Sequence, residues 1–224
     1  MTAKFISFLG WSIVLIVSLY FVYNNALHYF RYNSTEYGPD AWPRFAPTLL
    51  IHIIAGILAL LLGPFQFIPA IRNNYPKVHH TIGKTYLISI VIGAIASLNL
   101  SINKVMITEK ALVFGLGLFG LAVAWLLTSG MAYWSVRKKD FDQHREWMVR
   151  SYVVTTAFAS FRLFDKILSE KLHTDPAATG EVMAWACWAF PLMITEAFLQ
   201  GIKIRRGAIE RRKKPEDPLL SGQS

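Results

Sequence analysis

Long apolar runs separated by short polar segments dominate this sequence. Six of the runs are long enough for a helix that crosses the hydrocarbon core of a membrane, which takes about 20 residues. We place these spans at Phe5 to Tyr23, Thr48 to Ile68, Lys84 to Leu100, Ala111 to Val136, Glu146 to Ile167 and Glu181 to Ile204. The pattern therefore predicts an all-α fold, with a single six-helix transmembrane domain over residues 1–204 and a basic tail over residues 205–224.

The positive residues predict which side of the membrane each connection faces, because short cytoplasmic loops are enriched in Lys and Arg. Cations gather at residues 72–84, 137–145 and 203–214, whereas the alternate connections carry both signs. This pattern places both termini in the cytoplasm. The tail combines its charge with Pro215 and Pro218 and has no apolar periodicity, so we expect it to be disordered past its first turn.

The composition restricts the class of protein. Of the 224 residues, 54% are hydrophobic and only 17% are charged. This hydrophobic fraction is larger than a soluble domain normally buries. The net charge of +9 lies in loops and not on one amphipathic face, so we expect the lipid bilayer as partner and no nucleic acid. The sequence allows two further protein partners, a different membrane subunit or a second copy of this chain in a homodimer. The single cysteine, Cys187, excludes an intramolecular disulfide and a Cys-based zinc cluster. The sequence also lacks the motifs of soluble hydrolases, nucleotide-binding proteins and zinc proteases.

Polar residues at membrane depth are the candidates for function, because an ionisable group in a transmembrane helix is costly and usually faces a partner, a cavity or a cofactor. They form two layers, which the helical rise separates by roughly 20 Å. The outer layer contains His52, Asn99, Arg162 and Asp165. The inner layer contains Gln66, His79, His80, His144, Arg150, Glu196 and Gln200.

A strip of small residues follows His52 on one face of the second span. Gly56, Ala59 and Gly63 recur at helical spacing below the imidazole. One interpretation is that a porphyrin edge or a quinone lies against the glycines, with His52 as axial ligand or hydrogen-bonding partner. The other is close packing of a neighbouring helix, with His52 hydrogen-bonded to it. Pro64 follows the strip and interrupts the helix ladder, so the carbonyl that it frees needs another donor.

The inner layer allows a second site. His79 and His144 lie near the cytoplasmic ends of two predicted helices, where they could be the two axial ligands of one haem iron or bind a metal together with Glu196. Alternatively, they suit a cytoplasmic interface without any ligand, which is the reading that we favour for His80. Arg150 and Glu196 lie at matching depth and can form an intramembrane ion pair.

Three segments carry a resemblance to a known family. They read His52-xxx-Gly56-xx-Ala59-Leu60-xx-Gly63-Pro64-x-Gln66-Phe67, then His79-xxx-Gly83-xx-Tyr86, then His144-xx-Trp147-Met148-x-Arg150-Ser151. Over about Leu49 to Gly201, the chain resembles a family of predicted bacterial multi-pass membrane proteins catalogued as a domain of unknown function. That resemblance implies the bacterial inner membrane and supplies no activity. A looser similarity of architecture links the two histidine layers to transmembrane cytochromes b.

The function predicted from these features is a membrane redox protein that binds haem b or quinone. If haem is bound, one inner haem between His79 and His144 is the economical form, with His52 and Arg162 left for a quinone or a propionate. The alternatives are a small transporter or channel, in which the intramembrane ion pairs line a polar route, and a structural or assembly subunit. No catalytic residue is assigned, and the sequence does not decide whether the protein is an enzyme.

Overall fold

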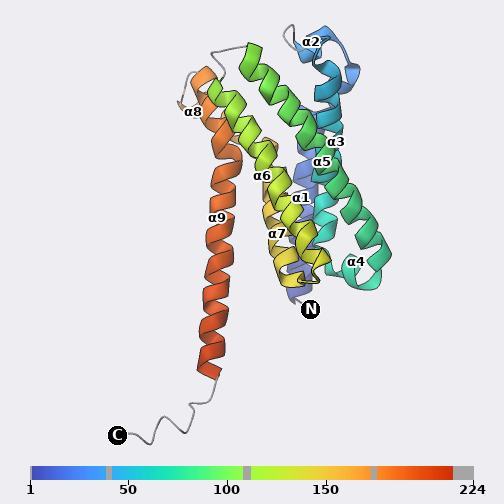
Figure 1. Ribbon diagram of the computed structural model, residues 1–224, viewed down its shortest axis with the longest axis vertical. Helices are drawn as coiled ribbons and strands as arrows, with labels where there is room; N and C mark the ends of the chain where they lie inside the picture. Colours follow the sequence, from blue (N-terminus) through green and yellow to red (C-terminus); the bar gives the residue numbers. More distant parts are fainter. Residues whose placement is uncertain (1, 39–41, 108–111, 173–175, 214–224) are drawn as a thin grey trace, which may run out of the picture.

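The computed structural model describes residues 2–38, 42–107, 112–172 and 176–213, and the regular structure in these ranges is entirely helical (Figure 1). The N-terminal part contains α1 (Thr2–Asn25), the 3₁₀ helix η1 (Leu27–Arg31), α2 (Ser34–Tyr37), α3 (Ala46–Gln66) and α4 (Pro69–Asn74). The rest contains α5 (Pro76–Ile107), α6 (Leu112–Arg137), α7 (Phe141–Thr155), α8 (Ala157–Leu172) and α9 (Pro176–Lys213). This confirms the predicted all-α class.

Four segments are long and apolar enough to cross a membrane: Ala46–Gln66, Pro76–Asn103, Leu112–Arg137 and Thr179–Ile209. They correspond to the second, third, fourth and sixth predicted spans, although α5 and α9 extend well beyond the predicted ends. Leu9–Asn25 in α1 is a shorter apolar helix. Figure 1 shows α1, α3, α5, α6 and α7 side by side, with α9 along the edge of the bundle.

The fifth predicted span, Glu146 to Ile167, is not a continuous helix. It is divided at Thr156 into α7 and α8, of 15 and 16 residues, and each is shorter than a typical transmembrane helix. Val153, Val154, Thr155 and Thr156 are four consecutive β-branched residues, which are poor helix formers. In addition, the Thr156 hydroxyl donates to the Val153 carbonyl at 2.8 Å, a local bond that competes with the regular ladder.

Helix α3 continues through Pro64 to Gln66, and the proline interrupts the hydrogen-bond ladder within it, as predicted. Pro64 has no N–H for the carbonyl of Leu60, and the hydroxyl of Tyr152 in α7 donates to that oxygen at 3.2 Å. The freed carbonyl is thus satisfied by protein, as its burial required.

The first part of the basic tail is more ordered than its composition predicted, and residues 214–224 lie outside the described residues. Helix α9 runs to Lys213, more than two turns past Arg205. Ala, Ile, Glu, Arg and Lys, which favour or tolerate a helix, supply most of this stretch, and the next proline is Pro215. Figure 1 shows that α1 begins and α9 ends at the same end of the molecule, while α2 lies at the other.

Candidate functional site

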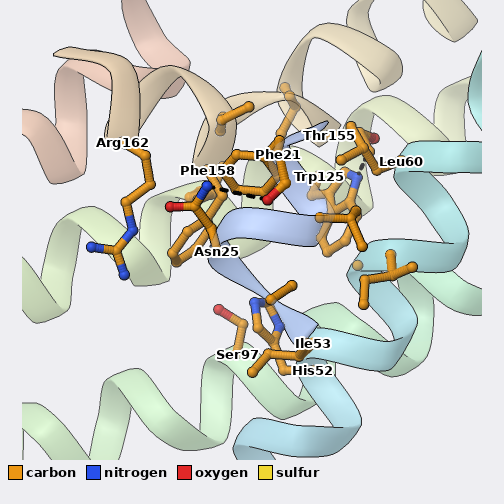
Figure 2. Close-up of a pocket in the computed structure, with 18 of the residues that line it drawn as sticks. Phe21, Asn25, His52, Ile53, Leu60, Ser97, Trp125, Thr155, Phe158 and Arg162 are labelled. Atoms are coloured by element: carbon orange, nitrogen blue, oxygen red, sulfur yellow. Dashed lines mark hydrogen bonds between the residues drawn. The ribbon is translucent and has the colours of Figure 1, made fainter. Parts of the chain in front are cut away.

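A cavity of about 130 Å³ lies between α1, α3, α5, α6 and the α7–α8 junction, toward the α2 end of the bundle. We call it the His52 pocket. Its wall is mainly aliphatic and aromatic, and its polar members include Asn25, His52, Ser97, Trp125, Thr155 and Arg162. Figure 2 shows these side chains around the space, with the bond from Trp125 to Thr155 drawn on one side.

The imidazole of His52 is held in one orientation by the backbone of α5. Its Nδ1 lies 2.8 Å from the carbonyl oxygen of Gly93, and a carbonyl only accepts, so Nδ1 carries the proton. In the neutral ring, Nε2 is therefore a free hydrogen-bond acceptor. A ligand that His52 recognises must donate a hydrogen bond or coordinate through a metal.

The strip of small residues below His52 is open at one end and filled at the other. A Cβ on Gly56 would have no atom within 4 Å, and Gly56 lines the His52 pocket. A Cβ on Gly63 would collide with the ring of Tyr152. The prediction that Gly63 leaves space for a ligand is therefore wrong, because Tyr152 from α7 occupies that space.

The other predicted outer residues separate from one another. Arg162 lines the His52 pocket, and Figure 2 shows its guanidinium at a different place on the wall from the imidazole of His52. Among the described residues, no hydrogen bond or ion pair joins Arg162 to Asp165 or to His52. Asn99 is exposed on α5, where its carbonyl oxygen accepts from Asn103 at 2.7 Å, and it does not line the pocket.

A buried hydroxyl cluster, which the sequence analysis did not identify, joins three helices below the pocket. The Tyr86 hydroxyl in α5 lies 2.8 Å from Ser151 Oγ and 3.0 Å from Thr155 Oγ1, both in α7. Ser151 also meets Ser129 Oγ of α6 at 2.8 Å, and Trp125 Nε1 donates to Thr155 at 2.8 Å. Tyr86 and Ser151 both belong to the sequence motifs, so the cluster gives these two positions a role in packing.

In the inner layer, His79 and His144 differ in their surroundings. His144 Nδ1 donates to the carbonyl oxygen of Ala132 at 2.8 Å, which leaves its Nε2 as an acceptor. His79 Nδ1 is buried and has no hydrogen-bond partner among the residues that the structure describes. Gln66 packs against Gly83 and donates to the His79 carbonyl at 3.4 Å.

The predicted ion pair between Arg150 and Glu196 is present. Arg150 Nη2 and Nε lie 2.6 and 2.7 Å from one oxygen of Glu196, and the guanidinium stacks on Trp147. Glu146 approaches Arg150 at 3.5 Å and Lys203 at 2.7 Å, so the network joins α7 to α9. Glu196 is thus occupied by Arg150, and within the described ranges no three His, Cys, Asp or Glu side chains gather as metal ligands. The alternative of a metal held with Glu196 is not supported.

Hydrogen bonds centred on Glu36 and Tyr37 hold the segment from His28 to Tyr37, which lies beside the His52 pocket. Glu36 in α2 accepts from His28 Nδ1 at 2.8 Å and from Arg31 at 3.1 Å, and the bond from His28 is the main cause that keeps the pKa of Glu36 below its usual range. Burial raises the pKa of Tyr37, whose hydroxyl donates to the carbonyl of Tyr29 at 2.9 Å. Because Tyr29 lines the pocket, these bonds fix one part of its rim.

Comparison with known proteins identifies a family. The model of a family described as "Predicted membrane protein (DUF2306)" matches residues 49–199, which confirms the resemblance drawn from the motifs. No curated protein and no solved structure matches the chain.

Proposed function

This chain belongs to the DUF2306 family of predicted membrane proteins, and we propose a function for it from its pocket. We propose that it is a multi-pass protein that binds a lipophilic molecule of the quinol class, with the ring of that molecule in the His52 pocket. The observation that carries the proposal is that His52 Nε2, which makes no hydrogen bond within the described part of the chain, and the open space at Gly56 border one cavity, with Arg162 on another part of its wall. Most other motif positions hold helices together.

The size of the pocket selects the ligand class. A cavity of about 130 Å³ is close to the roughly 150 Å³ that holds one benzene ring in an engineered protein core. A single quinol ring fits this space, with its tail directed out of the pocket. A haem, with four pyrrole rings, does not fit, so His52 is not proposed as a haem ligand.

The chemistry of the polar groups agrees with a quinol. Its ring hydroxyl can donate to His52 Nε2, which is an acceptor only. The guanidinium of Arg162 offers donors to the second ring oxygen. Arg150 and Glu196 do not line this pocket, so it does not supply the polar route that a transporter would need.

We expect His52→Ala to weaken the binding of 2-decylhydroquinone, whose ring has no other substituent, to the purified protein about tenfold, because the hydroxyl loses its acceptor, a change of roughly 1.4 kcal/mol. Gly56→Leu should abolish binding because the new side chain fills the pocket. Titration calorimetry in detergent measures both effects.

The matched control is Gly130→Leu, which also places a leucine at a helical glycine with open space but lies outside the pocket. Arg162→Ala should weaken binding, and the double variant with His52→Ala should be little worse than either single one, as for residues of one site. Unchanged quinol binding by the Gly56→Leu variant would refute the His52 pocket as the binding site and would favour the alternative of a structural subunit.

We further propose six membrane crossings, with α7 and α8 together forming the fifth and both termini cytoplasmic. The beginning of α1 and the end of α9 at one end of the molecule support an even number of crossings. Reporter fusions after Val136 and after Arg206 should read cytoplasmic, and one within Glu36 to Arg44 should read external. A fusion after Arg206 that reads external would exclude this topology.

A second candidate function rests on the inner histidines. His144 has the arrangement of an axial ligand, because its Nδ1 donates to the Ala132 carbonyl and leaves Nε2 free, and His79 would be the second ligand of one haem b, which would supply one-electron chemistry. Protein from haem-replete cells should then show a reducible Soret band that disappears in His79→Ala and in His144→Ala but survives His80→Ala. A colourless preparation without iron would end this candidate and leave the quinol pocket untouched.

A further inference from the structure

A second concavity, which we call the Lys84 groove, lies on the outside of the bundle between the neighbouring helices α5 and α6. It has a volume of about 400 Å³. Its lining residues are Lys84, Leu87, Ile88, Val91 and Ile92 of α5 and Leu126, Ser129, Gly130 and Tyr133 of α6. They recur every three or four residues on each helix, so the groove runs along the helix axes.

The groove is open because of a glycine. A Cβ on Gly130 would have no atom within 4 Å, whereas a Cβ on Gly117 or Gly120 of the same helix would meet α9. Several flanking side chains, Ile88, Val91, Ile92 and Tyr133, are exposed. In a membrane, an exposed apolar groove of this kind faces hydrocarbon, so an acyl chain is the occupant that its chemistry selects.

The polar end of the groove defines the kind of lipid. Since α5 and α6 run in opposite directions, Lys84 and Tyr133 lie at the same end (Figure 1). This end is at the level where the apolar helix α3 stops, because Gln66 contacts Gly83. Lys84 makes no ion pair with any described carboxylate. A cation at the membrane boundary beside a phenol suits an anionic headgroup.

The length of the groove agrees with one leaflet. From Lys84 to Ile92, the helical rise gives about 12 Å, against about 15 Å for half of a typical hydrocarbon core. We propose that the Lys84 groove is a binding site for one anionic phospholipid, with an acyl chain against Gly130 and the headgroup phosphate at Lys84. With the topology proposed above, this lipid belongs to the cytoplasmic leaflet.

Native mass spectrometry of the purified protein tests the site, with phosphatidylglycerol or phosphatidylcholine of identical chains added in steps. The wild-type protein should retain one phosphatidylglycerol at about a tenfold lower lipid concentration than phosphatidylcholine. Lys84→Gln should bring phosphatidylglycerol down to the level of phosphatidylcholine. Gly130→Leu should weaken the retention of both lipids at least fivefold, because the leucine fills the groove.

Two controls belong to this experiment. Lys138→Gln removes an exposed cation on Trp134, near the same end of α6 but outside the groove, and should change nothing. Gly56→Leu fills the His52 pocket and should keep the lipid, so the two sites are tested apart. Equal retention of both lipids by the wild type, no effect of Lys84→Gln, or a lipid-free dimer that Gly130→Leu dissociates would each overturn the proposal.

Discussion

Replacing Glu196 with leucine should destabilise the protein by about 3 to 5 kcal/mol, because it leaves the buried guanidinium of Arg150 without its main counter-ion. Among the described residues, Glu146, at 3.5 Å, is the carboxylate that remains beside the Arg150 guanidinium. Arg150→Met should cost less, since Glu196 is partly exposed and can turn outward. Unfolding in mixed SDS micelles measures the difference.

The double variant Arg150→Met with Glu196→Leu is the decisive comparison. Apolar residues of similar volume can replace a buried ion pair at little cost, so the double variant should be more stable than Glu196→Leu alone. If the double variant is as unstable as Glu196→Leu, the loss comes from packing and not from an uncompensated charge.

The second large effect is expected at Gly63, where alanine should destabilise the fold because its Cβ displaces the ring of Tyr152. Overpacking costs about 1 to 3 kcal/mol. The Leu60 carbonyl, which Pro64 leaves without a helical donor, would also lose the Tyr152 hydroxyl, at a further cost of about 1 to 3 kcal/mol. The same SDS unfolding assay applies.

Gly56→Ala is the control in the same helix. Its Cβ meets open space, and alanine favours a helix over glycine by roughly 1 kcal/mol, so stability should be unchanged or slightly higher. Tyr152→Phe isolates the hydrogen bond, because it keeps the ring. Equal stability of Gly63→Ala and Gly56→Ala would show that Tyr152 yields without cost.

The ion pair between Arg150 and Glu196 could be predicted from sequence, because the two residues carry opposite charges and lie at the same depth in their predicted spans. Two opposite charges at one level of a helical bundle have few other partners, and the structure joins them at 2.6 Å. His52 and Arg162 could likewise be assigned to one depth, and both line the pocket.

The role of the Gly63-Pro64 pair could not be predicted in the same way. A glycine shows that space exists beside a helix but not what fills it, and here the occupant is Tyr152, from a segment distant in the sequence. Its hydroxyl satisfies the carbonyl that Pro64 frees, so the two motif residues form a socket for one tyrosine. The hydroxyl cluster of Tyr86 and Ser151 escaped prediction because a lone Ser or Tyr in an apolar run looks the same whether paired or lipid-facing.

The helix break at Thr156 divides one wall of the His52 pocket between two helices that pack on different partners. Helix α7 is docked on α6 and α9, whereas α8 packs mainly on α9 and carries Phe158 and Arg162. Backbone hydrogen bonds still cross the break, from the Thr156 N–H to the Tyr152 carbonyl and from the Ser160 N–H to the Thr156 carbonyl, so α8 stays joined to α7 while it packs on α9. We therefore expect the quinol proposed above to enter the His52 pocket beside α8, directly from the bilayer.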